Sequence, residues 1–302
     1  MKKFLNLFLL FCLPVLVVGC VMEFALRQIP NAYQVKSDYL ETHRGRIKTL
    51  LLGSSHILYG VNPEYLTEEA LNYGHVSQTI DIDYDILHRY ISDLEALETV
   101  VLRLSYTTLF EQLKEGDEKW RIKDYTLYTD ISLDSKIKDH FEILSVKLKY
   151  NLERIYKYYI LNEAVEHVNK WGWASQEREQ TPENIEAVSM RVAKKHTAPS
   201  DVFYSENYKI LENIIKECTE KGIKVVLVTM PAYKDYIQHL DALQLEKTIN
   251  AGMRMDLEYS NCTYLNYLND NRFGRSDFLD ADHLNTQGAE KFSKIIDGIL
   301  RQ

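Results

Sequence analysis

Short, nearly continuous apolar runs alternate along most of the chain with longer segments in which apolar residues recur every three or four positions. Such runs are typical of parallel strands covered on both faces, and the longer segments are typical of amphipathic helices. The runs predict strands at residues 48–52, 70–74, 99–104, 225–229 and 263–267, and the periodic segments predict helices at residues 63–70, 81–97, 207–222, 236–258 and from 285 onward. This order predicts an α/β fold with a doubly wound parallel sheet of the flavodoxin-like type, in three α/β/α layers.

The alternation stops between residues 107 and 200, a stretch rich in Tyr, Lys and Glu. Apolar residues recur there at helical spacing and predict one long amphipathic helix over residues 137–159. We interpret the stretch as a helical insertion in the α/β domain. Its Trp171 and Trp173 could bind sugar faces or could be ordinary packing residues. His196, which follows two lysines, is expected to be solvated.

Two lysines precede an apolar run from Phe4 to about Ala25, which is just long enough to cross a bilayer. We favour an uncleaved membrane anchor over residues 1–26. A lipoprotein is the alternative, because Val17-Val18-Gly19-Cys20 is similar to a lipobox. In both cases the rest of the chain lies outside the cytoplasm, with an extended connector at residues 27–47 and the α/β domain at 48–302.

The composition changes this interpretation little. A net charge of −8 argues against nucleic acid as a partner. Cys218 and Cys262 could form a disulfide bond, but buried free thiols are the simpler interpretation. The Cys and His spacing indicates no zinc site, and we expect no cofactor.

The candidate chemistry lies at two distant places. Ser54 and Ser55 follow the first predicted strand, where free backbone N–H groups favour developing negative charge. Asp280 stands three residues before His283 in the loop that leads into the last helix. A serine hydroxyl needs a base within reach, and a carboxylate can hold that base in position. The carboxyl ends of parallel strands meet at one edge of a sheet, so these side chains are expected there together.

Together, Gly53-Ser54-Ser55 and Asp280-x-x-His283 resemble the signature blocks of the GDSL/SGNH hydrolase superfamily. The resemblance implies a nucleophile at Ser55, a base at His283 and an orienting acid at Asp280. Asp282 is then expected to be a solvated or turn residue.

The same resemblance suggests where an oxyanion would be bound. The candidates are the backbone N–H of Ser55 and three residues of the second block: Asn72, Ser77 and Gln78. Ser77 stands where the family usually has Gly. The third block reads Ser105-Tyr106-Thr107 and lacks the family's Gly-x-Asn, so the oxyanion hole is expected to be built differently or to be weak.

With its amino-terminal anchor, the chain resembles the membrane-anchored SGNH-like proteins of cell-surface O-acetylation and teichoic-acid D-alanylation. That resemblance implies acyl transfer to, or removal from, a surface glycan, with an acylated glycan or acyl donor as substrate and a membrane-bound O-acyltransferase as partner. Two alternatives stay open. One is a simple extracytoplasmic esterase for small esters, and the other is a non-catalytic binding or assembly protein that keeps the fold.

Overall fold

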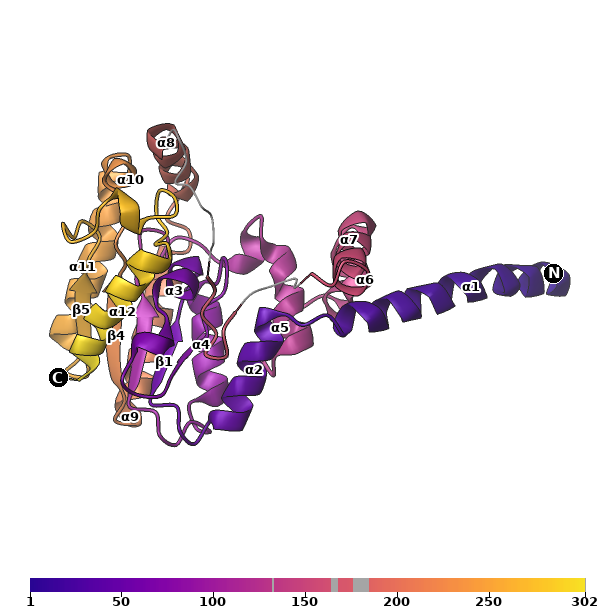
Figure 1. Cartoon of the computed structure of the whole chain (residues 1–302), viewed down its shortest axis with the longest axis horizontal. Helices are drawn as coiled ribbons and strands as arrows, with labels where there is room; N and C mark the ends of the chain where they lie inside the picture. The colour runs from indigo at the N-terminus through magenta and orange to yellow at the C-terminus, as the bar shows by residue number, and fades with distance from the viewer. Residues whose placement is uncertain (132, 164–167, 176–184, 302) are drawn as a thin grey trace. The chain divides into compact units, whose positions relative to one another are not determined.

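The computed structural model describes residues 1–131, 133–163, 168–175 and 185–301 (Figure 1). The chain divides into two compact units. Unit 1 consists of Met1–Val35 and Trp120–His167, and unit 2 consists of Lys36–Lys119 and Val168–Gln302. Parts of the predicted insertion, residues 132, 164–167 and 176–184, lie outside the described residues.

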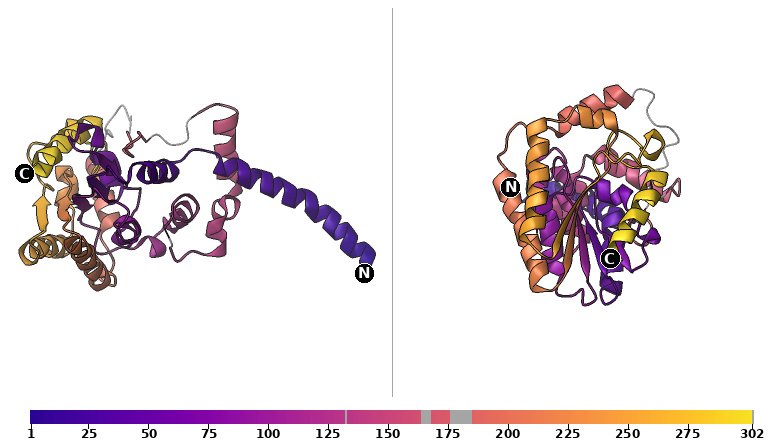
Figure 2. Two further views of the ribbon diagram at one scale, coloured as in Figure 1. Left: turned by 90° about the horizontal axis from the view of Figure 1, so that it is seen from below. Right: turned by 90° about the vertical axis from the view of Figure 1, so that its left-hand side faces the viewer.

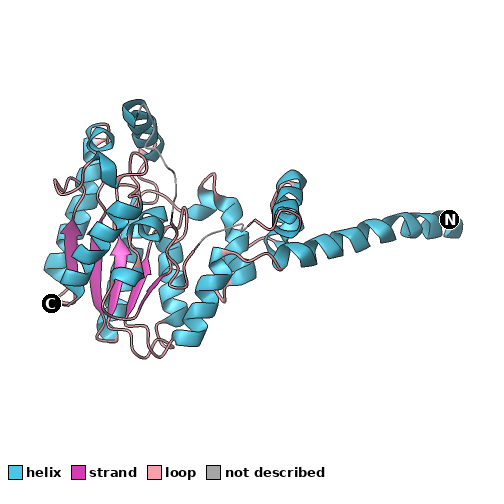
Figure 3. Ribbon diagram, in the orientation of Figure 1, coloured by secondary structure: helices cyan, strands magenta, loops and turns pink. Residues whose placement is uncertain are grey.

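Unit 2 is built on a sheet of five parallel strands in the order β2-β1-β3-β4-β5 (Figure 3). This is the flavodoxin-like order, so the predicted fold class is confirmed. The apolar runs become strands because side chains on both faces are buried, as in β1 and β3. The strands are β1 (Thr49–Leu52), β2 (Ala70–Asn72), β3 (Thr99–Arg103), β4 (Lys224–Thr229) and β5 (Cys262–Asn266).

Helices cover both faces of the sheet. On one face α12 packs with α3 around a core that includes Leu51, Val226 and Phe292. On the other face lie α9 and α11 (Figure 2), and α9 also contacts α4. The helices of unit 2 are α3 (Ser55–Gly60), α4 (Ile80–Tyr90), α8 (Ile185–His196), α9 (Tyr204–Glu220), α10 (Lys234–Gln238), α11 (Ala242–Glu258) and α12 (Thr286–Leu300), with 3-10 turns at Pro63–Tyr65, Leu113–Glu115 and Arg275–Asp277.

Unit 1 is helical. It contains α1 (Lys2–Arg27), α5 (Ile122–Tyr128), α6 (Glu142–Ser145), α7 (Leu148–Tyr159) and 3-10 turns at Lys119–Arg121 and Ile137–His140. The described part of α1 includes an 18-residue stretch, Leu10–Arg27, that is long and apolar enough to cross a membrane. Helix α2 (Ala32–His43) runs across the boundary of the two units.

Several predicted elements are wrong in detail. The connector expected to be extended contains α2, whose first turn is capped where Asn31 Oδ1 accepts a hydrogen bond from the Gln34 N–H. The helix expected at 63–70 is only the turn Pro63–Tyr65. The helix expected at 236–258 is two helices. The Asp241 side chain accepts a hydrogen bond from the Gln244 N–H and so caps the amino terminus of a separate helix, α11.

The long helix expected at 137–159 is also wrong. Phe141 and Val146 have extended backbone and divide the segment into a 3-10 turn, α6 and α7. Between them Glu142 is fully buried and pairs with Lys123 and Arg154 at 3.0 and 2.8 Å. Satisfying this buried carboxylate requires local structure that a single continuous helix would not give.

The cysteines follow the simpler interpretation. Cys218 and Cys262 are both buried and free, and burial raises the pKa of each thiol to about 12. A thiol with so high a pKa is inert at neutral pH.

Candidate active site

Ser55 is placed by a sharp turn at the end of strand β1, which lies between β2 and β3. Gly53 adopts φ +137°, and a Cβ there would lie 2.6 Å from the Arg103 Cβ, so only glycine fits. Ser54 is the N-cap of α3 and has extended backbone. Ser55 is therefore the first residue of α3 and stands at the carboxyl end of the sheet.

His283 comes from the loop before α12, where Asn285 caps the helix by accepting a hydrogen bond from the Gly288 N–H. Asp280 shapes this loop. Its Oδ1 accepts hydrogen bonds from the backbone N–H groups of Asp282 and His283 at 3.1 and 2.9 Å. The Asp280 carboxylate thus fixes the backbone that carries the imidazole.

The two predicted blocks meet although they are 228 residues apart in sequence. Ser55 Oγ lies 2.8 Å from His283 Nε2. On the other side of the ring, Nδ1 lies 3.0 and 3.1 Å from the two carboxylate oxygens of Asp280. A hydroxyl, an imidazole and a carboxylate in this order have the connectivity of a nucleophile, a base and an orienting acid.

A second carboxylate lies against the same imidazole. Asp282 Oδ1 is 3.5 Å from His283 Nδ1, and Asp282 Oδ2 is 3.1 Å from His56 Nε2. Only 2% of the Asp282 side chain is exposed, so of the two expected roles the solvated one is wrong, and Asp282 is a buried residue of a bend. The rings of His56 and His283 stack with centroids 4.8 Å apart, which holds both histidines around one buried carboxylate.

The hydrogen bonds define the state of His56. Its Nδ1 faces an Nη1 of Arg103 at 3.3 Å, and a guanidinium can only donate. Nδ1 is therefore the acceptor, and Nε2 carries the proton that points to Asp282. Burial lowers the pKa of His56 to about 4 in spite of the neighbouring Asp282, which agrees with a neutral ring.

The pKa of His283 moves in the opposite direction. Burial disfavours its charged form, but the charges of Asp282 and Asp280 together with the Asp280 hydrogen bond outweigh burial and raise the pKa to about 9. The same interactions lower the pKa of both aspartates against the effect of burial. At neutral pH the site therefore favours an imidazolium flanked by two carboxylates.

Three neighbours of this cluster were not identified as site residues in the sequence. Arg103 is buried at the end of β3, His196 lies with Nδ1 3.7 Å from Asp282 Oδ2, and Tyr236 places its hydroxyl 2.9 Å from the same nitrogen of His196. The prediction that His196 is solvated is wrong. Arg103 did leave a signal, since it is a charge at the end of an otherwise apolar strand.

His56, Asp282 and His283 also offer ligand atoms within 4.8 Å of one another, the one such grouping among the described residues. The three side chains already contact one another, and both nitrogens of His283 are hydrogen-bonded to Ser55 and Asp280. The polar network therefore accounts for their arrangement.

The candidate oxyanion donors have different surroundings. Asn72 is fully buried, and its amide donates to the carbonyls of Ile57 and Val61 at 2.7 and 2.8 Å. The amide of Gln78 donates to Asp83 at 2.6 Å. Both side chains are thus occupied by the fold rather than directed at a substrate.

Ser77 is different from these two. It adopts φ +60°, a conformation that glycine takes without strain, at the position where the family usually has Gly. Among the described residues no hydrogen bond is recorded for its backbone N–H. The first N–H of α3, that of Ser55, has no partner within the helix either. These two N–H groups are the candidate donors left.

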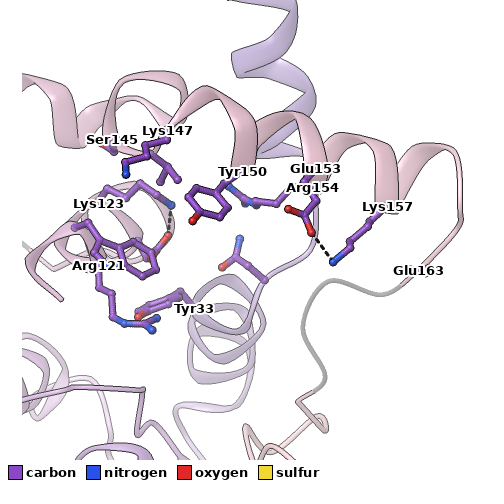
Figure 4. A pocket seen from close by; sticks show the side chains of 14 residues that line it. Tyr33, Arg121, Lys123, Ser145, Lys147, Tyr150, Glu153, Arg154, Lys157 and Glu163 are labelled. Atoms are coloured by element: carbon purple, nitrogen blue, oxygen red, sulfur yellow. Dashed lines mark hydrogen bonds and ion pairs between the residues drawn. The ribbon is translucent and has the colours of Figure 1, made fainter. Parts of the chain in front are cut away.

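One cavity lies beside the candidate site and another lies in unit 1. A cavity of about 20 Å³ borders His56 and is lined by Ser105, His196 and Tyr236 among others. A much larger cavity, of about 800 Å³, belongs to unit 1 and contains no residue of the Ser55 cluster (Figure 4). The small cavity has room for little more than one water molecule.

No protein-family model and no curated protein matches the sequence. Solved structures show a distant likeness. A Streptococcus pneumonia protein provisionally described as a platelet activating factor is 13% identical, with a TM-score of 0.43 over 95% of this chain and 99% of its own. A provisionally described acylhydrolase from Bacteroides fragilis is 11% identical, with a TM-score of 0.41 over 87% of this chain and 94% of its own.

A GDSL-like lipase from Bacteroides thetaiotaomicron is 10% identical, with a TM-score of 0.42 over 88% of this chain and 98% of its own. Because these TM-scores lie below 0.5, we infer the activity from the geometry of the site instead.

Proposed function

We propose that this protein is a serine acyl hydrolase or acyltransferase of the SGNH type. The observation that carries the proposal is the chain of contacts from Ser55 Oγ through His283 Nε2 and Nδ1 to the Asp280 carboxylate, at 2.8, 3.0 and 3.1 Å. Ser55 stands at the end of a strand, whereas His283 and Asp280 stand in a loop far away in the sequence. Only the folded chain brings the three residues together. The carboxylate also holds its own loop in shape, so the imidazole is oriented before any substrate binds.

The reaction has two halves. Ser55 Oγ attacks the acyl carbonyl while its proton passes to neutral His283 Nε2, and a tetrahedral intermediate forms. His283 then gives that proton to the leaving oxygen as the substrate ester bond breaks, which leaves the acyl group as an ester on Ser55. Water or an acceptor hydroxyl attacks the acyl-enzyme next, again with His283 as base, and releases a carboxylic acid or a new ester. Asp280 keeps the proton on Nδ1 throughout.

The negative charge on the carbonyl oxygen needs donors. We assign the backbone N–H groups of Ser55 and Ser77, since the amides of Asn72 and Gln78 are occupied. Loss of one donor in such a site costs about 3–4 kcal/mol of barrier. Two donors without a third-block Asn support slower chemistry than a full oxyanion hole would allow.

Substrate and location form the finer part of the proposal. Helix α1 supports a membrane anchor, or a lipoprotein through Cys20, with unit 2 outside the cytoplasm. We therefore propose acyl transfer to, or removal from, a cell-surface glycan, beside a membrane-bound O-acyltransferase that supplies the acyl group.

Covalent labelling tests the proposal. The full-length protein in detergent is treated with a fluorophosphonate and its intact mass is measured, beside Ser55→Ala, His283→Ala and Ser54→Ala. We expect one adduct in the wild type and in Ser54→Ala, and loss of the adduct in the other two variants. Ser54 is the matched control, because it is the neighbouring hydroxyl and its ring contact is with His56.

An unlabelled wild type that is folded by circular dichroism would overturn the catalytic proposal and favour a binding or assembly role. A labelled protein would next be given acetylated glycans. Release of acetate into water indicates a hydrolase, whereas acetyl transfer to a glycan hydroxyl indicates a transferase.

A further inference from the structure

The surface of unit 1 beside α1 presents exposed apolar side chains. We define the apolar face as nine exposed large apolar residues between positions 137 and 161, leaving out Tyr150, which lines the large cavity: Ile137, Phe141, Leu144, Leu148, Leu152, Tyr156, Tyr159, Ile160 and Leu161. Ile137 and Ile160 are 83% and 64% exposed. An exposed cluster of this kind marks a site of interaction with a protein or a membrane.

Helix α7 is amphipathic with its apolar side outward. Leu148, Leu152, Tyr156 and Tyr159 follow each other at spacings of three and four residues and all are exposed. Side chains from other positions of the helix, Tyr150, Arg154 and Lys157, line the large cavity of unit 1 (Figure 4). A soluble helix shows the opposite arrangement, with its apolar stripe in the core.

The apolar face is joined to α1 by specific contacts. Glu23 Oε1 and Oε2 accept hydrogen bonds from the backbone N–H groups of Glu142 and Ile143 at 3.1 and 3.0 Å. Tyr159 donates its hydroxyl proton to the Ala25 carbonyl at 2.9 Å. Glu23, the acidic residue that interrupts the apolar run of α1, therefore caps α6.

These contacts determine which part of α1 lies beside the apolar face. A span of about 20 residues that starts directly after Lys3 ends near Glu23. A Cβ at Gly19 would lie 3.7 Å from Ile143 Cδ1, so α6 reaches back to that level. At 1.5 Å per residue this places α6 about 6–12 Å from the Arg27 end of α1. When α1 crosses a bilayer, α6 and the apolar face are thus at its outer boundary.

The charge of the segment also differs from that of the whole chain. Residues 136–159 contain six Lys or Arg and three Asp or Glu, whereas the chain has a net charge of −8. Two of the three acids, Asp139 and Glu142, are buried. The accessible charge around the apolar face is therefore mainly positive, as in helices that lie on anionic membranes.

We infer that residues 137–161 form a second membrane contact, in which α6 and α7 lie in the headgroup region of an anionic lipid bilayer beside α1. The inference goes beyond the proposed chemistry and rests on α1 being inserted in the bilayer. A single tilting helix would leave unit 1 free to rotate about it. A helix pair lying in the interface holds unit 1 at a fixed height and orientation on the membrane.

Depth-dependent quenching tests this contact. The full-length protein carries Cys12→Ala and Cys20→Ala, while buried Cys218 and Cys262 stay in place. Single cysteines are introduced as Leu152→Cys in the apolar face, Val21→Cys in α1 and Leu257→Cys in unit 2, and each is labelled with the fluorophore NBD. Vesicles contain phosphatidylcholine and phosphatidylglycerol with shallow or deep doxyl lipids.

We expect shallow doxyl lipids to remove most of the fluorescence at Leu152→Cys and to leave Leu257→Cys unchanged. Leu257 is the matched control, an equally apolar side chain that is 86% exposed. Quenching at Val21→Cys reports insertion of α1 independently. If Val21→Cys is quenched and Leu152→Cys behaves like Leu257→Cys, the inference is wrong.

A blue-shifted Leu152→Cys signal that no doxyl lipid quenches would also overturn it. That result would mean that protein, such as a second copy or a membrane partner, covers the apolar face. None of these outcomes depends on labelling of Ser55, so failure of the acyl-transfer proposal would be seen separately.

Discussion

Asp282 Oδ1 lies 3.5 Å from His283 Nδ1, the nitrogen that also faces Asp280. One imidazole therefore lies against two carboxylates: the half-buried Asp280, which orients it, and the buried Asp282, which adds charge. The buried Asp282 binds His56 as well, at 3.1 Å. This arrangement stabilises the protonated ring and so affects the pH at which His283 can act as a base.

The first prediction concerns this pH dependence. A base must be neutral, and the pKa of His283 is raised to about 9 by Asp282 and Asp280 against the effect of burial. The neutral fraction rises with pH, so the rate of Ser55 labelling should increase up to about pH 9. Asp282→Asn removes one of the negative charges that raise the pKa of His283, so the midpoint of the labelling rate against pH should move to lower pH. Labelling rates across the pH range measure both.

Asp280→Asn is the control for this experiment. It removes the acceptor that keeps the proton on Nδ1, so labelling should be slower at every pH, by several orders of magnitude in comparable sites. Identical pH midpoints for wild type and Asp282→Asn would contradict the role given to Asp282.

The second prediction separates structure from catalysis at Asn72. Its amide donates to the carbonyls of Ile57 and Val61, and its Oδ1 accepts from the Gly74 N–H at 3.0 Å. Asn72→Ala should lower the free energy of unfolding by about 3 kcal/mol or more, because several buried polar groups lose their partners at 1–3 kcal/mol each. Urea unfolding gives the value.

The control for Asn72 is Asn250→Ala, an exposed position in α11, which should change stability by no more than about 0.5 kcal/mol. If Asn72→Ala is as stable as Asn250→Ala but loses labelling, Asn72 has a catalytic role after all.

The third prediction concerns Gly172, which has φ +86° and where a Cβ would lie 2.1 Å from the Asn72 carbonyl oxygen. Gly172→Ala should therefore destabilise the fold by more than about 1 kcal/mol, because backbone has to move. Gly298→Ala, in α12 with no atom within 4 Å of the new Cβ, should stabilise it by about 0.5–1 kcal/mol. A thermal unfolding midpoint that does not fall in Gly172→Ala would contradict the close approach at Gly172.

The fourth prediction concerns the buried ion pairs of unit 1. Burial opposes ionisation of Glu142, but the Arg154 hydrogen bond and the charges of Lys123 and Arg154 outweigh it and lower the pKa to about 2. A lowered pKa stabilises the fold above the ordinary value near 4.5, and this contribution is lost as the pH falls toward 2. Glu142→Gln should lower the free energy of unfolding by about 3–5 kcal/mol at neutral pH. The stability of the variant should also depend less on pH in the acid range.

Glu153→Gln is the matched control in the same helix bundle, since Glu153 forms an exposed pair with Lys157 at 2.9 Å. Its effect should be much smaller than that of Glu142→Gln, because solvent screens an exposed ion pair. Fluorescence of Trp120 reports unfolding of unit 1. Equal effects of the two substitutions would mean that the buried network contributes no more than a surface ion pair.

The sequence by itself determined the sheet and the two blocks of the candidate site. Strands such as residues 99–103 and 224–229 are apolar on both faces, so they have few alternatives to a doubly covered parallel strand. Ser55 and His283 stand at a strand end and before a helix, and parallel strands bring such positions to one edge. The local sequence pattern and the fold agree at these positions, so both blocks of the candidate site could be predicted from the sequence alone.

Only the tertiary structure decided which polar side chains are buried. Asp282, Arg103 and His196 gather in one cluster because segments distant in sequence surround them, and no local pattern records that environment. The helix predicted over residues 137–159 is broken because buried Glu142 needs Lys123 and Arg154 as partners, and the spacing of apolar residues does not record that need. The apolar residues of this segment do recur at helical spacing, but their side chains face outward beside α1. Periodicity alone does not show which environment an apolar stripe faces.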